Sequence, residues 1–131
     1  MKKGRKDRMK IDYEKTKQYY KELKVEELCD CDYCKNFRLH IKSSYPELAL
    51  YFEQLGVDIE KPLENTPGEP DKDGNMPYYV CQYIVFGTCP KDYHHQIGTV
   101  TIDLGTSYPS TGIEEEHFVL DAYTIELKWS F

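Results

Sequence analysis

The sequence lacks several features that would assign it to a protein class at once. No stretch of its 131 residues approaches the roughly 20 consecutive apolar residues that a membrane-spanning helix needs. The phosphate-binding loop, the glycine-rich dinucleotide turn, the nucleophile elbow of hydrolases and the H-E-x-x-H zinc motif are all missing. We therefore expect no membrane contact, and the common enzyme classes are disfavoured, although an enzyme is not excluded.

Positive charge is scarce outside the first eight residues. The net charge is −6, but residues 1–8 contain five Lys and Arg against one Asp, which leaves 12 Lys and Arg against 22 Asp and Glu elsewhere, or −10. An acidic body disfavours nucleic acid as a partner, because phosphates require a basic surface. We expect residues 1–8 to form a disordered basic extension and residues 9–131 to form a single domain, as this length is typical of one domain.

The N-terminal residues are basic but are followed by no apolar segment of the kind found in secretory signals. A cytoplasmic protein is therefore expected. Thiols stay reduced in the cytoplasm, and the five cysteines, an odd number, argue against a disulfide framework.

Helical patterns fill residues 9–56. Apolar residues recur at helical spacing in three segments, which predict helices over 12–24, 33–42 and 46–55. Asp12 and Asp32 are candidate N-caps for the first two helices. Ser44 and Glu47 form an S-x-x-E capping box for the third, and Gly56 is a natural stop.

Strand patterns fill residues 78–131. Strands are expected over 78–86, 97–104, 118–121 and 123–131, several of which alternate between apolar and polar residues. Residues 57–77 are rich in proline and glycine and predict a long irregular connection. The predicted fold class is α+β, with N-terminal helices packed on a C-terminal antiparallel sheet of about four strands.

Three cysteines, Cys29, Cys31 and Cys34, fall within six residues. Structural zinc requires four Cys or His ligands in a tetrahedron, and the C-x2-C spacing of Cys31 and Cys34 is the usual half of such a site. A second half-site is absent from the sequence, so the fourth ligand must come from elsewhere. The candidates are Cys81, Cys89, His40, His94 and His95.

Two other interpretations of the cysteines remain open. Cys31 and Cys34 have the spacing of a redox pair at a helix N-terminus, where the helix dipole lowers a thiol pKa, although the neighbouring Asp30 and Asp32 oppose this. Alternatively, the cysteines are core residues, because free cysteine is among the most buried residue types.

A polar face on the predicted sheet is a second candidate site. His117 and Asp121 share one face of their strand, and Asp103 lies on the polar face of another. Aligned, these three side chains would provide a histidine and two carboxylates for acid–base work. The pair His94 and His95 is more typical of a solvated turn.

The twelve tyrosines suggest a contact surface. Tyr78, Tyr79 and Tyr83 lie on one predicted strand and would stack against single-stranded nucleic acid or a peptide. No basic residues are interleaved with them, and tyrosine is enriched at protein interfaces. We therefore expect a protein partner.

Four segments carry a resemblance to a known family. They are Leu28–Phe37, which contains the cysteines, then Leu55–Pro62, Gln82–Gly87 and Ser110–Glu115. Together they resemble a family of small uncharacterised bacterial proteins with a CDCxYCxN segment. The resemblance covers the chain from Met9 onward. It implies a domain of its own kind and brings no established activity, so no functional residue is carried over from it.

The sequence favours a non-enzymatic binding or interaction module with a structural zinc at Cys29, Cys31 and Cys34. The alternative is a small enzyme or thiol-redox protein. Its chemistry would use either the Cys31/Cys34 pair or the polar face of His117, Asp121 and Asp103.

Overall fold

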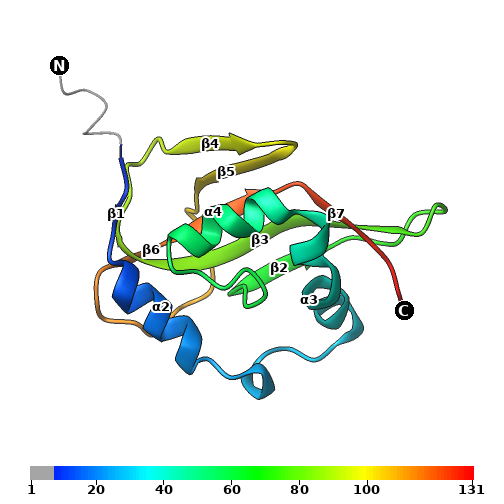
Figure 1. Cartoon of the computed structure of the whole chain (residues 1–131), viewed down its shortest axis with the longest axis horizontal. Helices are drawn as coiled ribbons and strands as arrows, with labels where there is room; N and C mark the ends of the chain where they lie inside the picture. The colour runs from blue at the N-terminus through cyan, green and yellow to red at the C-terminus, as the bar shows by residue number, and fades with distance from the viewer. Residues whose placement is uncertain (1–7) are drawn as a thin grey trace.

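The computed structural model describes residues 8–131, in which helices pack on an antiparallel sheet (Figure 1). The helices are α2 (Tyr13–Glu22), α3 (Asp32–Ser44) and α4 (Pro46–Gln54), with a 3₁₀ turn, η1 (Val25–Glu27), before α3. The strands are β1 (Lys10–Ile11), β2 (Glu64–Pro67), β3 (Asn75–Thr88), β4 (His94–Ile97), β5 (Val100–Leu104), β6 (His117–Tyr123) and β7 (Ile125–Lys128). The α+β class is confirmed. Nearly all of the expected basic extension, residues 1–8, falls outside the described residues.

The long strand β3 organises the sheet. Its middle pairs with β6 on one edge and with β2 on the other, so that Cys81 lies between Ala122 and Asn65. Near its two ends β3 also pairs with β7 and β1, while β5 and β4 continue the sheet beyond β6. All of these pairings are antiparallel.

The expected number of about four strands was too low, because residues 8–131 contain seven. Strand β1 has only two residues, too few to show a periodic pattern. Strand β2 reads Glu-Asn-Thr-Pro, and its proline is tolerated because the strand lies at an edge of the sheet. The segment 97–104, expected as one strand, supplies the end of β4, the Gly98–Thr99 turn and β5.

The helix boundaries follow local hydrogen bonds. The carboxylate of Asp12 accepts the Lys15 amide, which confirms the predicted cap of α2. The capping box predicted for α4 was wrong, because Tyr45 is the N-cap residue and no side chain caps this helix. Gly56, at φ +88°, ends α4 as predicted, since Val57 N donates to Phe52 O in a Schellman-type turn. No helix of residues 8–131 is long and apolar enough to cross a membrane.

The main core lies between the helices and the sheet. It joins Phe37, Ile41, Leu48 and Phe52 of α3 and α4 to buried residues of β3, β5, β6 and β7. Burial of this apolar surface is the main force that holds the two layers together. The opposite face of the sheet carries a smaller cluster, made of Ile84, Phe86 and Val119.

An irregularity in β3 changes which tyrosines are exposed. Asn65 pairs with Cys81 but Pro67 pairs with Tyr78, so β3 has one more residue than β2 across this interval. Such a bulge shifts the alternation of side chains. Tyr78 and Tyr83 are therefore both buried, and only Tyr79 is exposed. The expected stacking platform of three tyrosines on this strand was wrong.

Candidate metal centre

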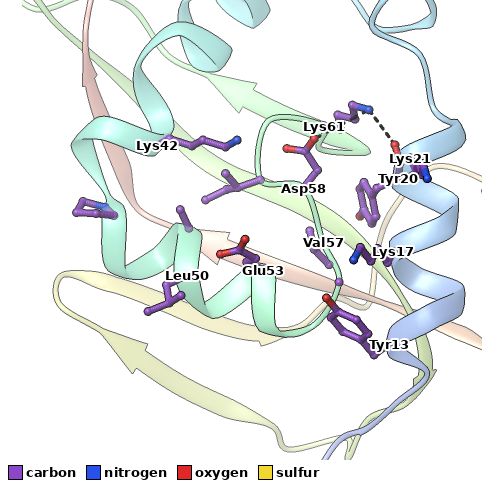
Figure 2. Close-up of a pocket in the computed structure, with 14 residues that line it drawn as sticks. Tyr13, Lys17, Tyr20, Lys21, Lys42, Leu50, Glu53, Val57, Asp58 and Lys61 are labelled. Carbon is purple, nitrogen blue, oxygen red and sulfur yellow. Dashed lines mark hydrogen bonds and ion pairs between the residues drawn. The ribbon is translucent and has the colours of Figure 1, made fainter.

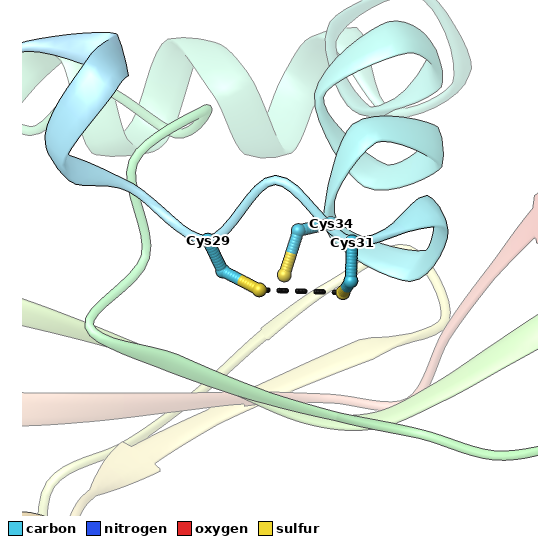
Figure 3. Close-up of side chains that lie close together, drawn as sticks. All are labelled: Cys29, Cys31 and Cys34. Atoms are coloured by element: carbon cyan, nitrogen blue, oxygen red, sulfur yellow. Dashed lines mark hydrogen bonds between the residues drawn. The ribbon is translucent and has the colours of Figure 1, made fainter.

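The three clustered cysteines meet at the N-terminus of α3 (Figure 3). Cys29 Sγ lies 3.3 Å from Cys31 Sγ, and the three Sγ atoms of Cys29, Cys31 and Cys34 lie within 4.8 Å of one another. All three are free thiols. Zinc–sulfur bonds of about 2.3 Å place tetrahedral ligands about 3.8 Å apart, so these sulfurs are close to the spacing that one ion requires.

Local backbone structure brings the thiols together. Cys31 is the N-cap of α3 and Cys34 lies in its first turn, so their side chains are on the same side of the helix start. The Arg38 guanidinium, one turn further along, donates a 3.1 Å hydrogen bond to the carbonyl of Cys29 and holds the preceding loop against the helix. The unpaired amides and the dipole of the helix start favour negative charge at this position.

The thiols differ in acidity. Hydrogen bonds from the Cys31 backbone and with the Cys31 and Cys34 thiols lower the pKa of Cys29. Burial, together with hydrogen bonds to the Cys29 and Cys31 thiols, raises the pKa of Cys34 to about 12. Cys29 is therefore the more acidic of these two thiols, and a metal ion bound by all three cysteines would have to displace the proton of Cys34.

The structure does not bring Cys81 or Cys89 to this group. Cys81 is fully buried in the core of the sheet, where burial raises its pKa. Cys89 follows β3, is half-buried and has a pKa raised by burial to about 11. The core interpretation thus holds for Cys81. It does not describe Cys29 and Cys31, which are exposed.

The candidate histidine ligands also lie elsewhere. His40 Nε2 lies 2.7 Å from Ser130 Oγ, and His94 and His95 belong to β4. Within residues 8–131, the close group of potential ligand atoms contains only the three cysteines. These cysteines line a cavity of about 320 Å³, whose wall includes Leu63 and the first residue of β2, Glu64.

The polar face of the sheet assembles differently from the prediction. Asp103 and Asp121 are register partners on β5 and β6, as expected. The third member is His94 from β4, whose Nδ1 lies 2.7 Å from the Asp103 carboxylate. The Tyr123 hydroxyl also donates to Asp103, and Gln82 Nε2 donates to Asp121 at 2.9 Å.

His117 does not join the group of Asp103, Asp121 and His94, which we call the face cluster. Its ring nitrogens lie 2.8 Å from Thr111 Oγ1 and from the carbonyl of Glu115. Asp121 is four residues further along the same strand, a distance of about 13 Å. Sequence reasoning did not place His94 beside Asp103. The two-residue Gly98–Thr99 turn sets the register of these two residues, and the sequence pattern predicts a strand there instead of a turn.

The pKa values of the two carboxylates in the face cluster shift in opposite directions. The hydrogen bond from Tyr123, with a smaller contribution from His94, lowers the pKa of Asp103. Burial raises the pKa of Asp121. The three cysteines line a cavity whose lining includes neither carboxylate, so the cysteine cluster is the better candidate for a functional site.

Comparison of this chain with protein-family models, curated protein sequences and solved structures found no match. The roles of the cysteines and of the face cluster are therefore inferred from geometry and chemistry. The family resemblance of the CDCxYCxN segment stays a prediction.

Proposed function

We propose that this protein binds one zinc ion through Cys29, Cys31 and Cys34 and acts as a binding module for another protein. The approach of three sulfur atoms to within 4.8 Å of one another carries this proposal. Thiolates are soft ligands that select zinc over hard cations such as magnesium or calcium.

No fourth Cys, His, Asp or Glu of residues 8–131 joins the close group of three sulfurs, so one zinc coordination position is left open. Three thiolates on a divalent ion carry a net charge of −1, which the start of α3 and the nearby Arg38 partly offset. Because the cysteines line a cavity, the fourth position is accessible to water or to a side chain of a partner protein.

An aromatic patch beside the cysteines supports a protein partner. We define it as Tyr33, Tyr79, Trp129 and Phe131. The rings of Tyr33 and Trp129 are 5.5 Å apart and those of Trp129 and Phe131 are 5.8 Å apart, while Tyr33 and Tyr79 line one shallow depression. Tyr79 and Phe131 are more than half exposed, at 52% and 56%. Exposed aromatic residues of this kind are enriched at protein interfaces.

The test of the zinc site is elemental analysis of untagged protein, with a thiol count in denaturant. We expect about one zinc per chain in the wild type and its loss in Cys31→Ser and Cys34→Ser. The matched control is Cys89→Ser, which removes a half-buried thiol outside the cluster and should retain the metal. No bound zinc after incubation with the free ion, together with five freely reacting thiols, would contradict the proposal.

The partner half of the proposal has its own readout. Trp129 is the only tryptophan, so a protein that docks on the aromatic patch should shift its emission. Tyr79→Ala should weaken that binding and leave the zinc content unchanged.

A second candidate function is thiol–disulfide exchange. It is favoured by the 3.3 Å separation of the Cys29 and Cys31 sulfurs and by the lowered pKa of Cys29. The reacting pair would then be Cys29 and Cys31 instead of the expected Cys31 and Cys34. Metal-free protein should show iodoacetamide labelling at neutral pH that is fastest at Cys29, because the thiolate is the nucleophile. Equal, slow labelling of all the cysteines would exclude this alternative.

A further inference from the structure

A groove of about 790 Å³ lies between α2 and α4, on the helical side of the molecule (Figure 2). Its floor is apolar and includes the buried Tyr20, Val57 and Ile59. The exposed side chains of Tyr13 and Leu50 stand at its rim. This volume is in the range of sites that hold small organic ligands, about 300–1,000 Å³.

Two contacts hold the groove at a defined width. Gly56 packs so closely on α2 that an added Cβ would lie 2.8 Å from the carbonyl oxygen of Tyr13. Further along, Lys61 Nζ donates to the carbonyls of Tyr20 and Leu23 at 2.8 and 2.6 Å, which ties the connection after α4 to the end of α2. A cavity that is already formed loses little entropy when it takes up a ligand.

Lysines approach the groove from two helices. Lys17 and Lys21 lie one turn apart on α2, and Lys42 extends into the groove from α3 (Figure 2). Like charges at the spacing of Lys17 and Lys21 destabilise an isolated helix. Within residues 8–131, no carboxylate forms an ion pair with Lys17 or Lys21, and Lys42 has only a 3.7 Å contact with Glu60. In a chain of net charge −6, these three cations form a local positive region above an apolar floor.

We propose that this groove binds a small organic phosphate with an apolar body. The dianionic phosphate contacts the amino groups of Lys17, Lys21 and Lys42, and the apolar body lies against Leu50 and Val57. Glu53 and Asp58 also line the groove and disfavour an anion, so these two carboxylates limit the affinity. This site shares no residue with the cysteine cluster, and the proposal is independent of zinc.

Three probes separate the contributions of charge and apolar contact. They are 1-naphthyl phosphate, 1-naphthol and inorganic phosphate, each titrated into the full chain at low ionic strength and followed by calorimetry or by NMR shifts of groove residues. We expect naphthyl phosphate to bind more tightly than either of the others. Equal binding of naphthol and naphthyl phosphate would overturn the anion site, and the absence of binding at millimolar naphthyl phosphate would overturn the whole proposal.

Variants then locate the site. Lys17→Gln and Lys42→Gln should each weaken naphthyl phosphate by about tenfold, the value of one charge-assisted hydrogen bond. Glu53→Gln should strengthen it. The matched control is Lys15→Gln, which changes the same helix and the same net charge but lies outside the groove lining. Exposed lysines tolerate this change without unfolding, which circular dichroism would verify. An equal loss of affinity in Lys15→Gln would show non-specific attraction and overturn the proposed site.

Discussion

The cysteine cluster and the lysine groove are built in opposite ways. The cysteines come from six consecutive residues, and the loop and first helical turn that contain them determine their geometry. The groove combines side chains of α2, α3, α4 and the segment after α4, so its shape depends on how these elements pack. Changes in helix packing should therefore damage the groove and spare the cluster, and changes at the base of α3 should do the reverse.

The largest effect is expected from Phe52→Ala. Phe52 is fully buried on α4, with its ring 4.5 Å from that of Tyr83, and its removal leaves a cavity in the main core. The free energy of unfolding in urea should fall by about 3–5 kcal/mol. Naphthyl phosphate binding should be lost because α4 forms one wall of the groove, while zinc binding should change only a few-fold.

The control on the same helix is Gln54→Ala, which removes an exposed side chain outside the groove lining and should change stability by less than about 0.5 kcal/mol. Equal losses of zinc and naphthyl phosphate affinity in folded Phe52→Ala would contradict the idea that the two sites depend on different parts of the fold.

The next effect tests the other side of the comparison. Asn36 is fully buried on α3, donates to the carbonyl of Lys128 and accepts the amide of Ser130, so it ties α3 to the end of the sheet. Asn36→Ala leaves these groups without their partner and should lower the free energy of unfolding by about 1–3 kcal/mol. Zinc affinity should fall, since the start of α3 holds the cysteines. Naphthyl phosphate affinity should fall less in folded protein, because Lys42 is the one residue of α3 that lines the groove. A larger loss of naphthyl phosphate affinity than of zinc affinity in Asn36→Ala would contradict the idea that the two sites depend on different parts of the fold.

A glycine pair isolates the close approach of α2 and α4. Gly56 and Gly74 both have positive φ, +88° and +82°, but an added Cβ meets the Tyr13 carbonyl only at Gly56 and meets nothing within 4 Å at Gly74. Gly74→Ala should lower stability by about 1 kcal/mol, the cost of a left-handed residue. Gly56→Ala should lower it by more and should also abolish naphthyl phosphate binding, as measured by urea unfolding and calorimetry. Equal losses of stability in the two variants would show that the close contact of Gly56 with the Tyr13 carbonyl does not determine the width of the groove.

The sequence predicted features that depend on neighbouring residues. The cap at Asp12, the stop at Gly56 and the alternation of Val100 and Ile102 toward the core all appear in the structure. In each case the signal lies within a few residues, because a cap or an alternation is a local hydrogen-bond or pleating pattern.

Features that depend on pairing between distant segments could not be predicted. Strand β2 forms because Glu64 and Asn65 meet β3, a partner whose position a polar four-residue segment does not reveal. The bulge that buries Tyr78 and exposes Tyr79 also depends on that partner. The same reason explains the candidate sites. The cysteines were found from their spacing, whereas the groove has no contiguous motif.

The smallest effect concerns the face cluster, which, like the groove, joins residues from different elements. The lowered pKa of Asp103 means that folding favours its charged form. The charged carboxylate therefore stabilises the fold at pH values above its unfolded pKa, near 3.8, and this stabilisation is lost as the pH falls through its lower folded pKa. The raised pKa of Asp121 has the opposite sign, so its charge costs stability at neutral pH. At pH 7, Asp103→Asn should therefore lower the free energy of unfolding and Asp121→Asn should raise it, each by less than about 1 kcal/mol because both side chains are partly solvated. Urea unfolding at pH 7 and pH 3 would measure both, and each difference should shrink at pH 3. Changes in the free energy of unfolding that have the same sign for both variants at pH 7 would contradict the opposite pKa shifts of the two carboxylates.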